Sequence, residues 1–133
     1  MSNTRLTVVV RRDLQLVPGL LAAQVAHMAD AFMRERVVKA MESKEKSSYD
    51  IFSEEEIDWM EKPYLSVLAV NTLEELNLVL KQAQENELPI HLWWDVIPSH
   101  IFEGQFLECK VGLSIGPDDF DKIKIVTGML PLY

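Results

Sequence analysis

The feature that most constrains the fold is the alternation of strand-like and helix-like segments along the chain. Residues 6–10 form an apolar run rich in β-branched side chains, which is typical of a strand buried on both faces. Pro18 stands where a helix can begin, and the run from Leu20 to Val38 contains no helix breaker, so it predicts one long helix. Alternating strands and helices imply parallel strand pairing, right-handed crossovers and helices on both faces of a sheet. The sequence therefore predicts an α/β fold.

Two further helices are marked by capping boxes at their starts. Residues 53–56 read Ser-Glu-Glu-Glu and residues 72–75 read Thr-Leu-Glu-Glu, each with a hydroxyl three positions before a glutamate. The first of these helices should be short and turn Ile57 and either Trp59 or Met60 toward the core. The second carries leucines at helical spacing and should end near residue 86.

Three more strands are expected, at residues 64–70, 88–96 and 109–116, with a turn-rich segment between the last two. Residues 118–130 read as a short helix or turn followed by an extended stretch. The most polar interval, residues 42–56, is an excursion within one domain and not a linker.

Length and cysteine usage agree with a simple organisation. A chain of 133 residues suits one domain, residues 1–133, with a substantial core. Charged residues interrupt every apolar stretch before about 18 residues, so no membrane span is predicted. Cys109 is the only cysteine, which excludes an internal disulfide and favours the cytoplasm.

The charge balance bears on the partners of the protein. The formal net charge is -8, from 13 basic and 21 acidic residues, and this argues mildly against binding to phosphate backbones. A local basic patch can still bind RNA. The only dense basic run is Arg11-Arg12.

Several kinds of site have no support in the sequence. There is no phosphate-binding loop, no Gly-x-Gly-x-x-Gly and no Gly-x-Ser-x-Gly motif. The possible metal ligands are His27, His91, Asp95, His100 and Cys109, without a His-x-x-x-His or Cys-x-x-Cys pair. We therefore expect neither a metal nor another cofactor.

Three blocks of sequence carry a resemblance to a known family. The first is VVVRRDL at residues 8–14, followed by AAQVAH at residues 22–27. The second is LPIHLWWD at residues 88–95, and the third is VGLSIGP at residues 111–117 followed by VTG at residues 126–128. In this order and spacing they resemble the archaeal and eukaryotic type of peptidyl-tRNA hydrolase, type 2.

The resemblance implies a fold, a reaction and partners. The fold would be a three-layer α/β structure with a four-stranded mixed sheet flanked by helices on both faces, in a homodimer. The reaction would be hydrolysis of the ester that joins a peptide to the terminal ribose of tRNA, which makes tRNA the implied partner, with another small ligand as the alternative. Such chemistry needs an activated water and hydrogen-bond donors where the oxyanion develops. The likeness is thin between residues 34 and 60.

Carried over residue by residue, the resemblance assigns catalytic roles to Gln24, His27, Asp95 and Ser99. Gln24 and His27 lie three positions apart and can face the same side of one helix. The alternative for this pair is two buried polar residues that satisfy each other. The alternative for Asp95 is a cap on the turn at Pro98.

The same comparison assigns substrate binding to Arg11, Arg12, Gly19 and His100. An Arg-x-Asp sequence, Arg11 with Asp13, can clamp a phosphate or form an internal pair, and the internal pair is the more common case. His100 stands where the family has a glutamine.

The resemblance does not extend to the lysines of the family's glycine- and lysine-rich loop. The family's loop of the form Lys-Met-Gly-Lys-Gly-Lys corresponds to QLVPGL, residues 15–20, so the lysine regarded as catalytic falls on Leu20 and another falls on Pro18. Loss of one oxyanion donor typically costs about 10²–10³ in rate. Two hypotheses follow: a divergent hydrolase with Arg11 or Arg12 as substitute cation, or a non-catalytic dimeric binding module on the same scaffold.

Three tryptophans offer aromatic surfaces. Trp59, Trp93 and Trp94 are able to stack on bases. A tryptophan in a strand is more often part of the core or of an interface, and we predict that role for them.

Overall fold

The computed structural model describes residues 3–43, 51–98 and 106–133, and in it the predicted strands form one sheet. The strands are β1 (Thr4–Arg11), β2 (Leu65–Val70), β3 (Ile90–Pro98) and β4 (Phe106–Asp119), in the order β2-β1-β4-β3. β1 pairs in parallel with β2, and β4 runs antiparallel to both β1 and β3. The mixed four-stranded sheet implied by the resemblance is confirmed.

The parallel pairing predicted from the alternation of strands and helices is found only between β1 and β2. Parallel neighbours need a crossover of a dozen or more residues, and α1, α2 and α3 supply it between these two strands. Only residues 99–105 separate β3 from β4, which is too few for a crossover helix. These two strands therefore pair antiparallel.

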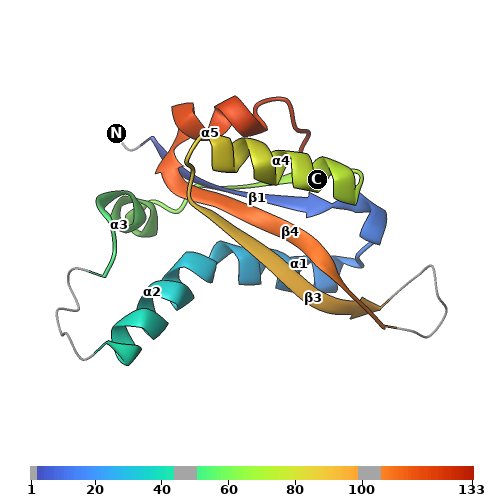
Figure 1. Ribbon diagram of the computed structural model, residues 1–133, viewed down its shortest axis with the longest axis horizontal. Coiled ribbons are helices and arrows are strands. Elements are labelled where there is room, and N and C mark those ends of the chain that lie inside the picture. Colours follow the sequence, from blue (N-terminus) through green and yellow to red (C-terminus); the bar gives the residue numbers. More distant parts are fainter. Residues whose placement is uncertain (1–2, 44–50, 99–105) are drawn as a thin grey trace.

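Helices cover both faces of the sheet (Figure 1), as predicted. α1 lies against one face and α4 and α5 lie against the other. The helices are α1 (Pro18–Ala29), α2 (Ala31–Glu42), α3 (Glu54–Glu61), α4 (Leu73–Glu85) and α5 (Phe120–Thr127), with a 3-10 turn at Arg12–Leu14.

β1 is the strand that both cores share. Val9 packs with Leu76 and Ile123 in the cluster under α4 and α5. Val8 and Val10 belong to the cluster under α1. All three valines are fully buried, which confirms the reading of this run as a strand covered on both faces.

The predicted long helix is broken at Asp30. This residue ends α1 with φ -95° and ψ 2°, and α2 begins at Ala31. No glycine or proline marks the break, but aspartate competes with the backbone for hydrogen bonds and is a weak helix former. The change in direction brings Phe32 into a third buried cluster with Leu6 and Trp59. Tertiary packing, not the local sequence, decides this boundary.

The capping box of α3 is confirmed, with one error in the expected core. The Ser53 hydroxyl accepts a hydrogen bond from the Glu56 backbone, and the Glu56 carboxylate accepts one from the Ser53 backbone. Trp59 is buried and its indole donates to the carbonyl of Tyr64. Ile57, in contrast, is 41% exposed, so its predicted inward position is wrong.

The capping box of α4 is only half formed. The Thr72 hydroxyl accepts from the Glu75 backbone at 3.1 Å, as predicted. The Glu75 carboxylate accepts from the Asn71 backbone instead of that of Thr72. The helix ends at Glu85 and Asn86 is its C-cap, which confirms the predicted end.

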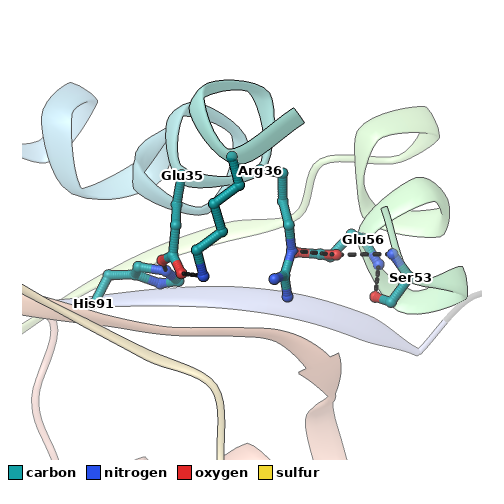
Figure 2. A network of polar contacts seen from close by, with 6 residues as sticks. Glu35, Arg36, Ser53, Glu56 and His91 are labelled. Carbon is teal, nitrogen blue, oxygen red and sulfur yellow. Dashed lines mark hydrogen bonds and ion pairs between the residues drawn. The ribbon is translucent and has the colours of Figure 1, made fainter. Parts of the chain in front are cut away.

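Glu35 and Arg36 join α2 to neighbouring elements through polar contacts (Figure 2). Glu35 contacts the imidazole of His91 on β3. Arg36 donates to both carboxylate oxygens of Glu56 at 3.3 Å, next to the capping box with Ser53. Glu56 is 4% exposed, so its carboxylate joins two helices from a buried position.

We therefore expect the substitution Glu56→Ala to lower the free energy of unfolding by about 2 kcal/mol. It removes the acceptor of the Ser53 backbone N–H and leaves Arg36 without its partner. Urea unfolding followed by circular dichroism measures the loss. The matched control is Glu55→Ala, one position away on the exposed side of α3, which should change stability by less than about 0.5 kcal/mol. Equal effects of the two substitutions would contradict the role of Glu56.

The C-terminal segment lies along the outer edge of β2. Leu132 forms an antiparallel bridge with Leu68. The backbone of Ala69 donates to Pro131 at 2.9 Å, and that of Tyr133 donates to Val67 at 3.0 Å. The segment thus adds two backbone hydrogen bonds to the edge of the sheet.

Candidate active site

The centre of the candidate site is a hydrogen-bonded pair of Gln24 on α1 and Asp95 on β3. The Gln24 amide nitrogen donates to one carboxylate oxygen of Asp95 at 2.9 Å. The Gln24 amide oxygen accepts from the indole nitrogen of Trp93 at 2.6 Å. The second carboxylate oxygen of Asp95 accepts from the backbone of Val96 at 2.7 Å. Gln24 is 2% exposed, and its two bonds fix the orientation of its amide and of the aspartate.

Packing below the site explains why α1 meets β3 here. Trp93, Asp95 and Ile97 alternate along β3 and face α1. Ile97 and Met28 belong to the same cluster and are both almost fully buried. The packing of α1 on β3 in this cluster positions Gln24 next to Asp95.

His27 lies beside this pair but does not bond to it. Its ring stacks on Trp93, with centroids 4.9 Å apart and planes at 22°. The side chain is exposed, and within the described part of the chain it has no hydrogen-bonding partner. The alternative of a buried, mutually satisfied Gln24–His27 pair is therefore wrong, since Gln24 is satisfied by β3.

The sequence analysis did not single out Arg34, an arginine that lies beside the pair of Gln24 and Asp95 without bonding to either residue. Its guanidinium carbon lies 5.4 Å from the centroid of the Trp93 ring. Its Nε pairs with Asp30 at 2.8 Å and its Nη2 donates to the carbonyl of His27 at 2.6 Å. Arg34 follows His27 by seven positions, but the break at Asp30 lies between them, so spacing on one continuous helix does not predict where Arg34 lies.

The arginines that the sequence proposed as substitute cations are engaged elsewhere. Arg11 pairs with Asp13 at 2.7 Å and donates to the carbonyl of Lys110, which confirms the internal pair. The hydrogen bond with Asp13 raises the pKa of Arg11, against the lowering effect of burial. Arg12 donates to the carbonyl of Leu132 and lies over the ring of Tyr133. Neither arginine hydrogen-bonds to Gln24 or Asp95.

With this geometry in place, comparisons with known proteins decide the family. The family model for peptidyl-tRNA hydrolase PTH2 matches residues 4–133. The chain belongs to the PTH2 family. It is 32% identical to a peptidyl-tRNA hydrolase of Nanoarchaeum equitans over 127 residues, which cover 95% of this chain and 96% of the relative. It is 30% identical to a peptidyl-tRNA hydrolase of Sulfurisphaera tokodaii over 130 residues, covering 97% and 98%.

A solved structure shares the fold at lower similarity. A protein of unknown function from Agrobacterium tumefaciens superposes with a TM-score of 0.52 and 15% sequence identity, covering 100% of this chain and 99% of that protein. This likeness supports the architecture alone. Membership of the PTH2 family supports a peptidyl-tRNA hydrolase-like function.

The start of α1 contains two of the positions that the resemblance singled out in this PTH2 protein. Gly19 is the second residue of the helix, and a Cβ there would meet no atom within 4 Å. Leu20, where the resemblance led us to expect a lysine in the family, packs at the edge of the cluster that contains Met28. Ser99 and His100, also predicted for the site, lie outside the described residues.

The tryptophans of this PTH2 protein divide between the core and the surface. Trp59 is buried as predicted, and Trp93 is half-buried in the site. Trp94 is 51% exposed, so it is not part of the core, and of the predicted core or interface role only the interface is left for it. The pairing of β3 with β4 shifts register between Trp93 and Trp94. Trp94 lies beside Lys110, whose ammonium is 5.5 Å from the ring centroid and bonds to Asn77 of α4.

The described residues show neither a metal-binding cluster nor a membrane-spanning helix. They contain no group of three or more His, Cys, Asp and Glu side chains placed to hold a metal ion. None of the helices in this part of the chain combines the length and apolarity needed to cross a bilayer.

Proposed function

We propose that this chain is a divergent peptidyl-tRNA hydrolase-like protein that keeps the hydrogen-bonding part of the site and lacks its cation. Its hydrolysis of peptidyl-tRNA is then weak or absent. One observation carries the proposal: Asp95 is oriented by Gln24 and by the Val96 backbone, and no cationic side chain of the described residues bonds to either Asp95 or Gln24.

Of the two requirements for ester hydrolysis, activation of a water and stabilisation of the oxyanion, the proposed site retains the first. A carboxylate held by an amide donor can orient a water and accept its proton, provided that the substrate carbonyl lies within hydrogen-bond reach. Gln24 holds Asp95 in such a position on β3. The second requirement is stabilisation of the oxyanion, which the leucine at position 20 cannot supply. The expected deficit is about 10²–10³ in rate.

The same loss favours the second candidate function, a binding module on the PTH2 scaffold. With hydrocarbon at Leu20, the protein would hold the tRNA end without releasing the peptide. The proposal includes a homodimer, which the family implies, and a cytoplasmic location, which the single cysteine favours. The proposed partner is tRNA, and no cofactor takes part.

The test is release of peptide from peptidyl-tRNA by the purified protein and by Asp95→Asn. We expect kcat/KM for the wild type to fall below about 10⁴ M⁻¹ s⁻¹, the lower end for ordinary enzymes. Any residual turnover should vanish in Asp95→Asn. Asp121→Asn, an exposed aspartate on α5, is the control for charge and should behave as wild type. A wild-type rate in the ordinary enzymatic range, or turnover that survives in Asp95→Asn, would overturn the proposal.

A further inference from the structure

We propose that His27, Trp93 and Arg34 form a nucleotide-binding platform. An unpaired base of the tRNA 3′ end stacks on the exposed face of His27, and Arg34 pairs with an adjacent phosphate. This inference rests on the proposed function and deepens it, because it names the part of the substrate that the site holds.

The stack presents one open aromatic face. Trp93 covers one face of the imidazole at a centroid distance of 4.9 Å. The indole is itself held by its hydrogen bond to the buried Gln24. The His27 side chain remains exposed. Proteins bind unpaired bases by stacking them on aromatic rings, histidine included. A base on His27 would extend an ordered stack of two rings to three.

Arg34 is a cation that two hydrogen bonds hold in place and that still has unused hydrogen-bond donors. Its Nε bonds to Asp30 and its Nη2 bonds to the carbonyl of His27, which fixes the guanidinium plane. Within the described residues its Nη1 has no partner. The Arg34 side chain is 47% exposed and that of Asp30 is 46% exposed. An exposed ion pair contributes little stability, and a guanidinium matches the geometry of phosphate.

The platform lies next to Asp95 along β3. Trp93 and Asp95 both contact Gln24, and alternate residues of a strand are on the order of 7 Å apart. In peptidyl-tRNA the terminal ribose separates the last base from the peptide ester. A base stacked on His27 therefore directs the ester toward Asp95.

The experiment measures binding of the trinucleotide CCA, which is the unpaired end of tRNA without peptide or ester. Tryptophan fluorescence at low ionic strength reports binding. We expect His27→Ala to weaken binding by about 10-fold, since stacking contributes about 1–3 kcal/mol per base. His27→Phe restores the ring and should restore most of the affinity. A CCA probe with an abasic 3′ nucleotide should bind His27→Ala and wild type equally.

Arg34 is tested through the salt dependence of binding. Arg34→Gln should reduce the slope of log K against log salt by about 0.7, the value for one phosphate contact on a single strand. Lys110→Gln removes the cation that lies beside Trp94 and should leave affinity and slope unchanged.

Several results would overturn the platform: no binding of CCA, equal affinities of wild type and His27→Ala, or equal effects of Arg34→Gln and Lys110→Gln. The trinucleotide contains no ester, so these failures leave the proposal for Asp95 intact. Rapid peptide release by the wild type would instead overturn the proposed function and leave the platform standing. The two proposals therefore fail separately.

Discussion

Replacing Leu20 by lysine should raise the rate of peptidyl-tRNA hydrolysis by about 10²–10³-fold over wild type. Leu20 lies one helical turn before Gln24 and therefore on the same side of α1. It is only partly buried, so a lysine stem can follow the apolar surface while its ammonium extends toward the side of Asp95. Single-turnover release of peptide measures the gain.

The matched control for this prediction is Leu21→Lys. It makes the same chemical change one residue along, where the side chain lines an apolar groove between α1 and β2 on the other side of the helix. Leu21→Lys should give no gain, and adding Asp95→Asn to Leu20→Lys should remove it. If both lysine variants were equally active, the gain would come from general attraction of tRNA and the assignment of position 20 would fail.

Gly112→Ala should lower the free energy of unfolding by about 3 kcal/mol, the upper part of the range for overpacked cores. Gly112 lies on β4 under α1, and a Cβ there would stand 2.2 Å from the carbonyl oxygen of Val9 and 3.0 Å from the sulfur of Met28. The first neighbour is backbone of the central strand, so relief requires movement of β1. Urea unfolding at a single temperature measures the change.

Gly19→Ala is the control for this substitution, because a Cβ at Gly19 meets no atom within 4 Å. It should leave stability unchanged or raise it by up to about 1 kcal/mol through the entropy of the unfolded chain. A Gly112→Ala protein as stable as Gly19→Ala would show that β1 and β4 can separate at little cost.

The parts of the fold that depend on local sequence could be predicted. The β-branched run of β1 identified a buried strand, and Ser53 with Glu56 identified the start of α3. Asn86 was expected at the end of α4 and is its C-cap. In each case a few neighbouring residues contain the whole signal.

The parts that depend on tertiary contacts could not be predicted. The break at Asp30 serves the packing of Phe32, whose partners Leu6 and Trp59 lie far away in the sequence. The 51% exposure of Trp94 depends on which part of the sheet the helices cover, and no pattern within β3 encodes this.

The candidate site was predictable only through the family resemblance. It placed Gln24 and Asp95 in one site, and the structure joins them at 2.9 Å. It also drew attention to Arg11 as a substitute cation, but the cation beside Trp93 is Arg34. Arg34 belongs to the stretch where the likeness is thin, and its place depends on the turn at Asp30.

The C-terminal segment along β2 bears on the solution behaviour of the protein. An edge strand with free amides and carbonyls invites pairing with other molecules and is a common origin of aggregates. Here the groups of Val67 and Ala69 are taken up by Tyr133 and Pro131. Arg12 further clamps this segment through the carbonyl of Leu132. An arginine first considered for catalysis thus holds the segment that covers this edge of the sheet.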